Sequence, residues 1–265
     1  MANTSSDHRS SIYQDLHHHQ MSEEEEANHK SARLILTELF RYYSPKSALD
    51  IGCGFGTWLE VSQQLGVKDI LGIEGSWLDR SLVCIPQQLI CDIDLEQPFD
   101  LKRRFDLVIC LEVAEHLSPA AAAGFVESMV RHGDLILFSA AIPFQGGHHH
   151  VNEQFLDYWS NLFQYFDYRP VDFLRPIFWQ NPSILWWLRQ NLIVFAKNKL
   201  LLDTNLFGGI CNQPSPLSIV HPDVYLSRIR SATAEYNKLI SLLSTGNSFE
   251  LNRQPDGQFS IIRTS

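Results

Sequence analysis

From residue 47 onward the chain alternates short apolar runs with amphipathic stretches, and this alternation constrains the fold more than any other feature. Each run lasts about five to eight residues and is bounded by Gly, Pro, Asp or Ser, as is typical of strands buried on both faces. Repetition of strand and helix predicts a parallel sheet with helices on both faces. The five runs are SALDIG (47–52), DILGIE (69–74), QLICD (88–92), FDLVICLE (105–112) and GDLILFSA (133–140).

Helical patterns lie between and around these runs. In the stretch 118–133, Ser118 stands where an N-cap is expected and Pro119 where the first helical residue is expected. Upstream, Ser22 followed by the acidic run EEEE indicates the start of a helix that ends before Pro45. The other expected elements are a helix at 57–66, short turns near 77–81 and 98–103, a helix near 153–165, and strands at 168–176 and 191–198.

These patterns divide the 265 residues into three parts. Residues 1–21 are polar and are expected to be disordered. Residues 22–200 form the α/β domain together with its N-terminal helix. Residues 201–265 form a C-terminal extension with one helix, 222–244, which ends in a polar, frayed segment.

Composition excludes several classes of protein. The net charge of −9 and the lack of a basic stripe count against binding of nucleic acid. The N-terminus has no apolar signal sequence, and no uncharged apolar stretch is long enough to span a bilayer. Five cysteines, an odd number with no CxxC pair, indicate reduced thiols in place of a disulfide framework or a cysteine zinc site. A soluble, cytoplasmic protein is expected, with an unknown oligomeric state.

The stretch ALDIGCGFGTW closes the first strand and opens the first helix. Its glycines, Gly52, Gly54 and Gly56, would let the backbone approach a ligand at a helix N-terminus. Glu74 ends the next strand, where a carboxylate can accept hydrogen bonds from two ribose hydroxyls. Asp50 would repel a pyrophosphate but suits a ligand with an ammonium group, such as the methionine part of S-adenosylmethionine.

The motifs LDIGCGFGTW, GIEGS, ICDID and FDLVICLEVAEHL resemble, in order and spacing, those of class I S-adenosylmethionine-dependent methyltransferases. The resemblance covers about residues 45–200 and implies a Rossmann-like fold. Such a fold has a seven-stranded, mostly parallel sheet with helices on both faces and an antiparallel last strand. It also implies a set of cofactor-binding residues. These are Asp50, Gly52, Cys53, Gly54, Gly56, Glu74, Gly75, Asp92, Ile93, Leu111 and Glu112.

The run CLEVAEHL places Glu112, Glu115 and His116 directly behind the fourth strand. Their spacing resembles that of metal-using ubiquinone-pathway O-methyltransferases and small-RNA 2′-O-methyltransferases. That resemblance implies a divalent cation, Mg²⁺ or Mn²⁺, held by Glu112, Glu115, His116 and a later histidine, for which His150 is the best candidate. Two alternatives stay open. His116, with Glu115 and His150 beside it, acts directly as base or acceptor-positioning group, or the run is purely structural.

The stretches GGHHHVNEQFLDYWSNLF and FWQNPSILWWLRQNLIVF resemble a set of bacterial methyltransferases, some of them linked to cell-surface glycans. Trp179, Trp186 and Trp187 are expected near the acceptor, where aromatic faces suit sugars, although core packing explains tryptophans equally well.

The leading hypothesis is a methyltransferase that acts on an oxygen of a small molecule or glycan. The alternatives are a metal-dependent RNA 2′-O-methyltransferase and a non-catalytic cofactor-binding partner subunit. A nicotinamide dehydrogenase ranks last, because the third glycine of its fingerprint is missing.

Overall fold

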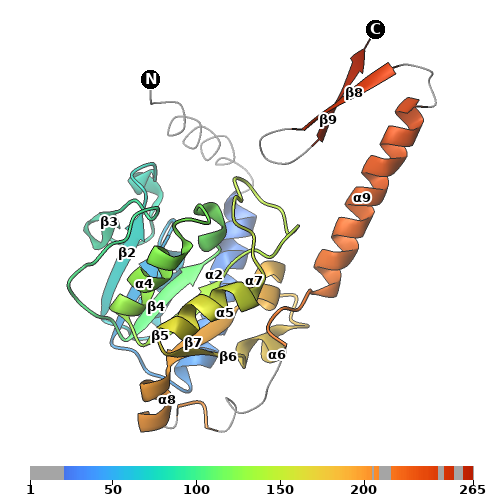
Figure 1. Ribbon diagram of the computed structural model, residues 1–265. Helices are drawn as coiled ribbons and strands as arrows, with labels where there is room; N and C mark the ends of the chain where they lie inside the picture. Colours follow the sequence, from blue (N-terminus) through green and yellow to red (C-terminus); the bar gives the residue numbers. More distant parts are fainter. Residues whose placement is uncertain (1–20, 205, 209–215, 244–247, 254–258, 265) are drawn as a thin grey trace.

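The computed structural model describes residues 21–204, 206–208, 216–243, 248–253 and 259–264. At its centre lies a seven-stranded sheet with the order β3-β2-β1-β4-β5-β7-β6 (Figure 1). β1 to β5 run parallel, and β7 runs antiparallel to both of its neighbours. The predicted fold class is therefore confirmed. The strands are β1 Ser47–Ile51, β2 Asp69–Glu74, β3 Ile90–Asp92, β4 Leu107–Leu111, β5 Leu135–Ser139, β6 Tyr168–Val171 and β7 Ile193–Lys197.

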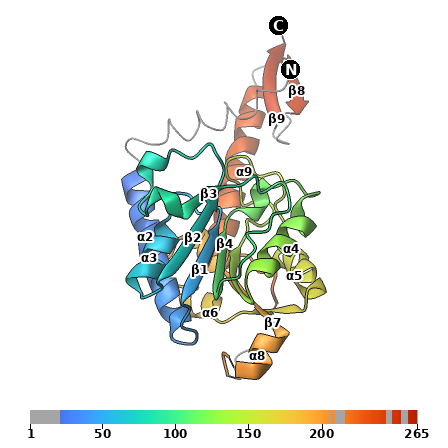
Figure 2. The same cartoon turned by 90° about the vertical axis from the view of Figure 1, so that its left-hand side faces the viewer.

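Helices cover both faces of this sheet (Figure 2). α2, α3, α6 and α7 pack on one face, whereas α4 and α5 pack on the other. Successive strand residues alternate between the two cores, so that Leu137 joins the first core and Phe138 the second. The helices are α2 Met21–Phe40, α3 Thr57–Gln64, α4 Ala122–His132, α5 Leu156–Tyr165, α6 Leu174–Phe178, α7 Trp186–Asn191, α8 Asn198–Thr204 and α9 Pro222–Leu243, with short 3₁₀ turns η1 Arg80–Leu82, η2 Gln87–Leu89 and η3 Ala114–His116.

The predicted start of the helix at 118–133 is wrong. α4 begins at Ala122, with Ala121 in the N-cap position. Ser118 does not cap it, because its backbone N–H and its hydroxyl donate to the two carboxylate oxygens of Glu96, each at 2.8 Å. The Ser118 carbonyl instead accepts from the Ala121 N–H and closes a turn before the helix.

The predicted strand 168–176 is too long. β6 ends at Val171, and the short helix α6 follows from Leu174. The buried Arg175 causes this change of direction, since its guanidinium pairs with Asp172 three residues earlier and donates to the Leu217 carbonyl at 2.8 Å. The expected turn near 77–81 overlaps η1. In the stretch 98–103, where a short turn was also expected, the chain bends at Lys102, whose N–H donates to the Asp100 carboxylate at 2.8 Å.

The C-terminal extension differs most from its prediction. The expected helix is confirmed as α9, but α8 is a second helix, and the segment expected to fray forms an antiparallel hairpin. Its strands are β8 Ser248–Arg253 and β9 Phe259–Thr264. α9 leads away from the sheet towards this hairpin (Figure 1). The expectation of disorder over 1–21 lies outside the described residues except for Met21, which begins α2. None of the described helices is long and apolar enough to cross a membrane.

The strand order places a topological switch point between β1 and β4. From β1 the chain proceeds to β2 and β3 on one side, and from β4 to β5 on the other. The connections leave these two strands in opposite directions and so create a crevice at their carboxyl ends, where open α/β sheets bind ligands.

Candidate active site

A cavity of about 210 Å³ lies at this crevice. Its walls come from the loop after β1 and from the end of β4, where Leu111 and Glu112 lie. Further walls come from α2, through Glu25 and Asn28, and from Trp187 at the start of α7. The cavity thus joins several of the predicted cofactor residues, namely Asp50, Gly52, Cys53, Gly54, Leu111 and Glu112.

The loop after β1 needs glycine at its first position. Gly52 has a φ of +75°, and a Cβ there would lie 2.4 Å from Cγ2 of Val113. The N–H groups of Gly52 and Cys53 both donate to the Ile73 carbonyl, at 2.8 and 3.0 Å, which fastens the loop to β2. Only a residue without a side chain lets this backbone pass so close to the chain that follows β4.

Two buried acidic residues, Asp50 and Glu74, lie beside the same loop. Glu74 accepts the N–H groups of Gly54 and Gly75, each at 2.8 Å. Burial raises the pKa of Glu74, and the two amides oppose that rise. Burial and the nearby Glu74 raise the pKa of Asp50 well above its ordinary value. A cationic group entering the cavity would relieve this repulsion, which fits the ammonium group inferred from Asp50 in the sequence.

The structure places five of the predicted cofactor residues outside the cavity wall, namely Glu74, described above, and Gly56, Gly75, Asp92 and Ile93. Asp92 is exposed at the end of β3 and pairs with Arg80 at 2.5 Å, and the N–H of Ile93 donates to the Glu74 carbonyl. The indole of Trp77 lies against Gly75. Gly56 is the N-cap residue of α3. These residues lie around the loop and β2, but they do not line the cavity.

α2 contributes to the cavity in a way that the sequence did not reveal. The Trp58 indole N–H donates to Asn28 at 3.1 Å, and the Thr57 hydroxyl donates to Glu25. Both contacts join α2 to the first turn of α3 across about 30 residues of sequence. The only local signal was that Glu25 and Asn28 lie three residues apart and therefore on one helix face.

Glu112 occupies the wall at the end of β4, with its backbone in the left-handed region at φ +53°. Gln145 donates to one carboxylate oxygen at 2.9 Å, and Asn191 donates to the other at 3.1 Å. Burial raises the pKa of Glu112, whereas hydrogen bonds from Asn191, Ser139 and Gln145 lower it. Gln145 and Asn191 were not predicted as site residues, although Asn191 belongs to the quoted WWLRQN stretch.

Glu115, His116 and His150 form a separate group. One potential ligand atom from each lies within 4.8 Å of the others, and Glu112 is not part of this group. The rings of His116 and His150 meet edge to face with centroids 4.9 Å apart. Glu115 is fully buried, and neither of its carboxylate oxygens makes a hydrogen bond. Burial and the neighbouring Glu112 raise the pKa of Glu115 well above its ordinary value, and nearby backbone amides offset this only in part.

Backbone contacts bring His150 to this group although it lies 34 residues beyond His116. The N–H groups of Val151 and Asn152 donate to the Glu115 carbonyl at 2.9 and 3.0 Å. His148 and His149, the other members of the HHH run, are exposed. His150, the histidine that the sequence favoured, is therefore the one that lies beside Glu115 and His116, because its loop docks onto η3.

The tryptophans divide between roles. Trp187 lines the cavity and meets Trp186 edge to face at 5.2 Å. Trp179 instead packs against His221, with ring centroids 4.6 Å apart, and accepts a hydrogen-bond contact from that ring at its backbone carbonyl. Trp187 thus lies in the wall of the cavity, whereas Trp179 contacts the segment just before α9.

The fold is a Rossmann-like sheet with a reversed strand, and a cavity lies at its switch point. The family model described as "Methyltransferase domain" matches residues 18–190, well over half of the chain. The chain belongs to this family and is an S-adenosylmethionine-dependent methyltransferase domain.

Solved structures with a similar fold include the sugar N-methyltransferase KedS8 from Streptoalloteichus, at 18% identity over 63% of this chain and 87% of that one, with a TM-score of 0.48. The small RNA methyltransferase HEN1 matches at 17% identity over 63% of this chain and 25% of that one, with a TM-score of 0.47. A methyltransferase from Archaeoglobus fulgidus matches at 18% identity over 63% and 95%, with a TM-score of 0.45. Likeness at this level does not identify an acceptor. No curated protein sequence matches the chain.

Proposed function

We propose that this methyltransferase transfers the methyl group to a hydroxyl oxygen of a small molecule or glycan. The supporting observation is the Glu115 carboxylate, which is fully buried without a hydrogen bond beside the His116 and His150 imidazoles. A buried carboxyl group without a hydrogen-bond partner costs about 1–3 kcal/mol, and more when it is ionised, so such a group is retained where a ligand or a reaction compensates it. A hydroxyl acceptor must lose a proton during transfer, which gives this cluster a task.

The residues on the cofactor side position the methyl donor in this proposal. Asp50 faces the ammonium group, and the loop at Gly52 and Gly54 lets the backbone approach the methionine part closely. Glu112, held by two amide side chains, forms the wall between the cofactor cavity and the cluster. Methyl transfer from a sulfonium is an in-line displacement, so alignment and exclusion of water supply much of the acceleration.

The cluster also fits a divalent cation. Glu115, His116 and His150 supply one carboxylate and two imidazoles, a donor set that suits Mn²⁺ and, with added water ligands, Mg²⁺. A cation bound there would lower the pKa of an acceptor hydroxyl. Glu112 is left out of the proposed ligand set, because it does not belong to the group whose ligand atoms lie within 4.8 Å of one another.

Heavy-methyl cofactor tests the proposal. The protein is incubated with cell extract and cofactor that carries a ¹³CD₃ group, and mass spectrometry locates the label. Label on oxygen of a small molecule or glycan is expected; label on nitrogen, or in RNA, would overturn the proposal. The same assay with EDTA, followed by Mn²⁺ or Mg²⁺, tests the cation. Undiminished transfer in EDTA would leave His116 or His150 as the base.

A further inference from the structure

The loop between β5 and α5 is fastened by one carboxylate. Glu153 accepts the N–H of Phe144 at 2.8 Å and that of Gly146 at 2.9 Å, so it closes the loop 144–153 on itself. Its third contact is the Nδ1 atom of the His150 ring, at 2.9 Å. Glu153 is less than half exposed, and all three contacts use its carboxylate oxygens.

This contact determines which ring nitrogen of His150 carries the proton. A carboxylate only accepts hydrogen bonds, so Nδ1 must be the donor. Neutral imidazole carries a single N–H, and the lone pair is therefore left on Nε2. Gly147 lies close to the Nε2 edge of the ring, and it has to be glycine, because a Cβ there would come within 2.3 Å of Nε2. The hydrogen bond to Glu153 thus fixes both the tautomer and the position of the His150 ring.

The same loop docks against Glu115 and His116. Amides of Val151 and Asn152 bind the carbonyl of Glu115, and the His150 ring meets that of His116. We propose that Glu153 is a positioning residue that holds His150 as the Nδ1–H tautomer, with the Nε2 lone pair offered to the Glu115–His116 cluster. The use of that lone pair rests on the proposed function, whereas the tautomer does not.

Nuclear magnetic resonance tests the tautomer directly. Long-range ¹H–¹⁵N spectra of full-length protein with ¹⁵N-labelled histidine distinguish Nδ1–H from Nε2–H rings, and the signal lost in His150→Asn identifies His150. The Nδ1–H form is expected in the wild type. In Glu153→Ala this preference should be lost, and the matched control Glu127→Gln, an exposed residue of α4, should retain it. An Nε2–H ring in the wild type, or an unchanged Nδ1–H ring in Glu153→Ala, would overturn the inference.

Binding of Mn²⁺ alone, followed by electron paramagnetic resonance without acceptor or turnover, separates this inference from the proposed function. Loss of the carboxylate partner of a metal-binding histidine typically weakens metal binding by about 10- to 100-fold. Glu153→Ala should show that loss, Glu153→Gln a smaller one, and Glu127→Gln none, with circular dichroism to verify folding. Equal affinity in folded Glu153→Ala would contradict the positioning role. Absence of Mn²⁺ binding in the wild type, with the expected tautomer, would contradict only the cation.

Discussion

The two sides of the candidate active site are built by different means. On the cofactor side, backbone amides of the loop after β1 bind the Ile73 carbonyl and Glu74, all within one β-α-β unit. On the proposed acceptor side, side chains far apart in sequence are hydrogen-bonded to one another, as Gln145 and Asn191 are to Glu112. We expect the backbone loop after β1 to tolerate few substitutions at its glycines. Each substitution in the network of distant side chains should reduce function by less.

The largest effect is expected on the cofactor side, from Gly52→Ala. A Cβ would lie 2.4 Å from Val113 in a left-handed backbone conformation. Strain costs about 1–2 kcal/mol and overpacking about 1–3 kcal/mol. The free loop relieves both by moving, and cofactor binding has to restore its conformation, so we expect a loss of affinity from about 30-fold to more than 1,000-fold. Isothermal titration with S-adenosylmethionine measures it. Gly124→Ala, within α4 and 3.1 Å from Pro98, is the control that should bind normally; equal affinity of both variants would refute the glycine argument.

On the acceptor side, Asn191→Asp should have the next largest effect. Asn191 donates to Glu112 and to Gln145, and an aspartate would remove both donors and place a second negative charge beside Glu112. A buried unpaired group costs about 1–3 kcal/mol, which corresponds to a loss of roughly 5- to 150-fold in kcat/KM.

Asn181→Asp is the matched control, since Asn181 uses only its carbonyl oxygen, to accept the Ser183 N–H. Comparable losses in both variants would show that amide donors at Glu112 have no special importance. A loss confined to Asn191→Asp would show that the two sides of the site meet at Glu112.

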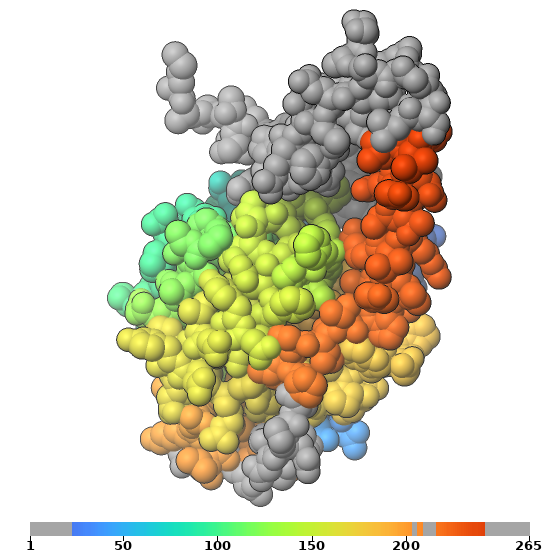
Figure 3. Space-filling view, turned by 45° about the vertical axis from the view of Figure 1, so that its right-hand side comes forward, coloured from blue at the N-terminus to red at the C-terminus, as the bar shows by residue number. Residues whose placement is uncertain are grey.

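A smaller effect is expected where the C-terminal extension meets the acceptor side. α9 lies against the part of the chain that contains the site loop, as the space-filling view shows (Figure 3), and Arg228 donates to the Gln145 carbonyl. Arg228→Ala should lower kcat about fivefold, since a hydrogen bond from a charged group contributes about 1.5–3 kcal/mol and solvent compensates part of it at this exposed residue. The exposed Arg230→Ala on the same helix is the control. Equal kcat in Arg228→Ala would separate α9 from the reaction.

The sequence predicted most of the features that depend on residues close together in the chain. Apolar runs located the strands of the sheet, and the spacing of the glycines and Glu74 located the cofactor side, because each depends on neighbours within one β-α-β unit. Gln145, Asn191 and Glu25 were missed, because their positions depend on contacts 32 to 79 residues away. The start of α4 was predicted wrongly for the same reason, since Glu96 engages Ser118. His150 was found because a motif, not a periodicity, marked it.

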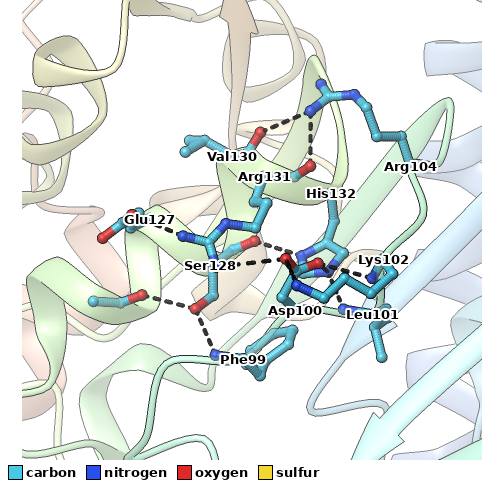
Figure 4. A network of polar contacts seen from close by, with 11 residues as sticks. Phe99, Asp100, Leu101, Lys102, Arg104, Glu127, Ser128, Val130, Arg131 and His132 are labelled. Carbon is cyan, nitrogen blue, oxygen red and sulfur yellow. Dashed lines mark hydrogen bonds and ion pairs between the residues drawn. The ribbon is translucent and has the colours of Figure 1, made fainter.

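His132 lies in the other half of the domain, and both nitrogens of its ring are hydrogen-bonded (Figure 4). Its Nδ1 donates to the Ser128 carbonyl at 2.5 Å, and its Nε2 accepts the Leu101 N–H at 2.9 Å. The ring is fully buried and stacks on Phe99 with centroids 5.2 Å apart. A proton on Nε2 would face the Leu101 N–H donor, so the folded protein holds this histidine neutral.

Burial lowers the pKa of His132 below its ordinary value of 6.5, and the Ser128 carbonyl opposes this shift only in part. The unfolded chain therefore takes up a proton first as the pH falls. The stability that neutral His132 contributes is complete above pH 6.5 and is lost as the pH falls from there towards the lowered pKa. The slope cannot exceed about 1.4 kcal/mol per pH unit for one proton. Urea unfolding between pH 7 and pH 5 should show it, and His132→Phe should remove it while cofactor affinity at pH 7 stays unchanged. A change in cofactor affinity would show that this end of the sheet, opposite the cavity, is coupled to the site.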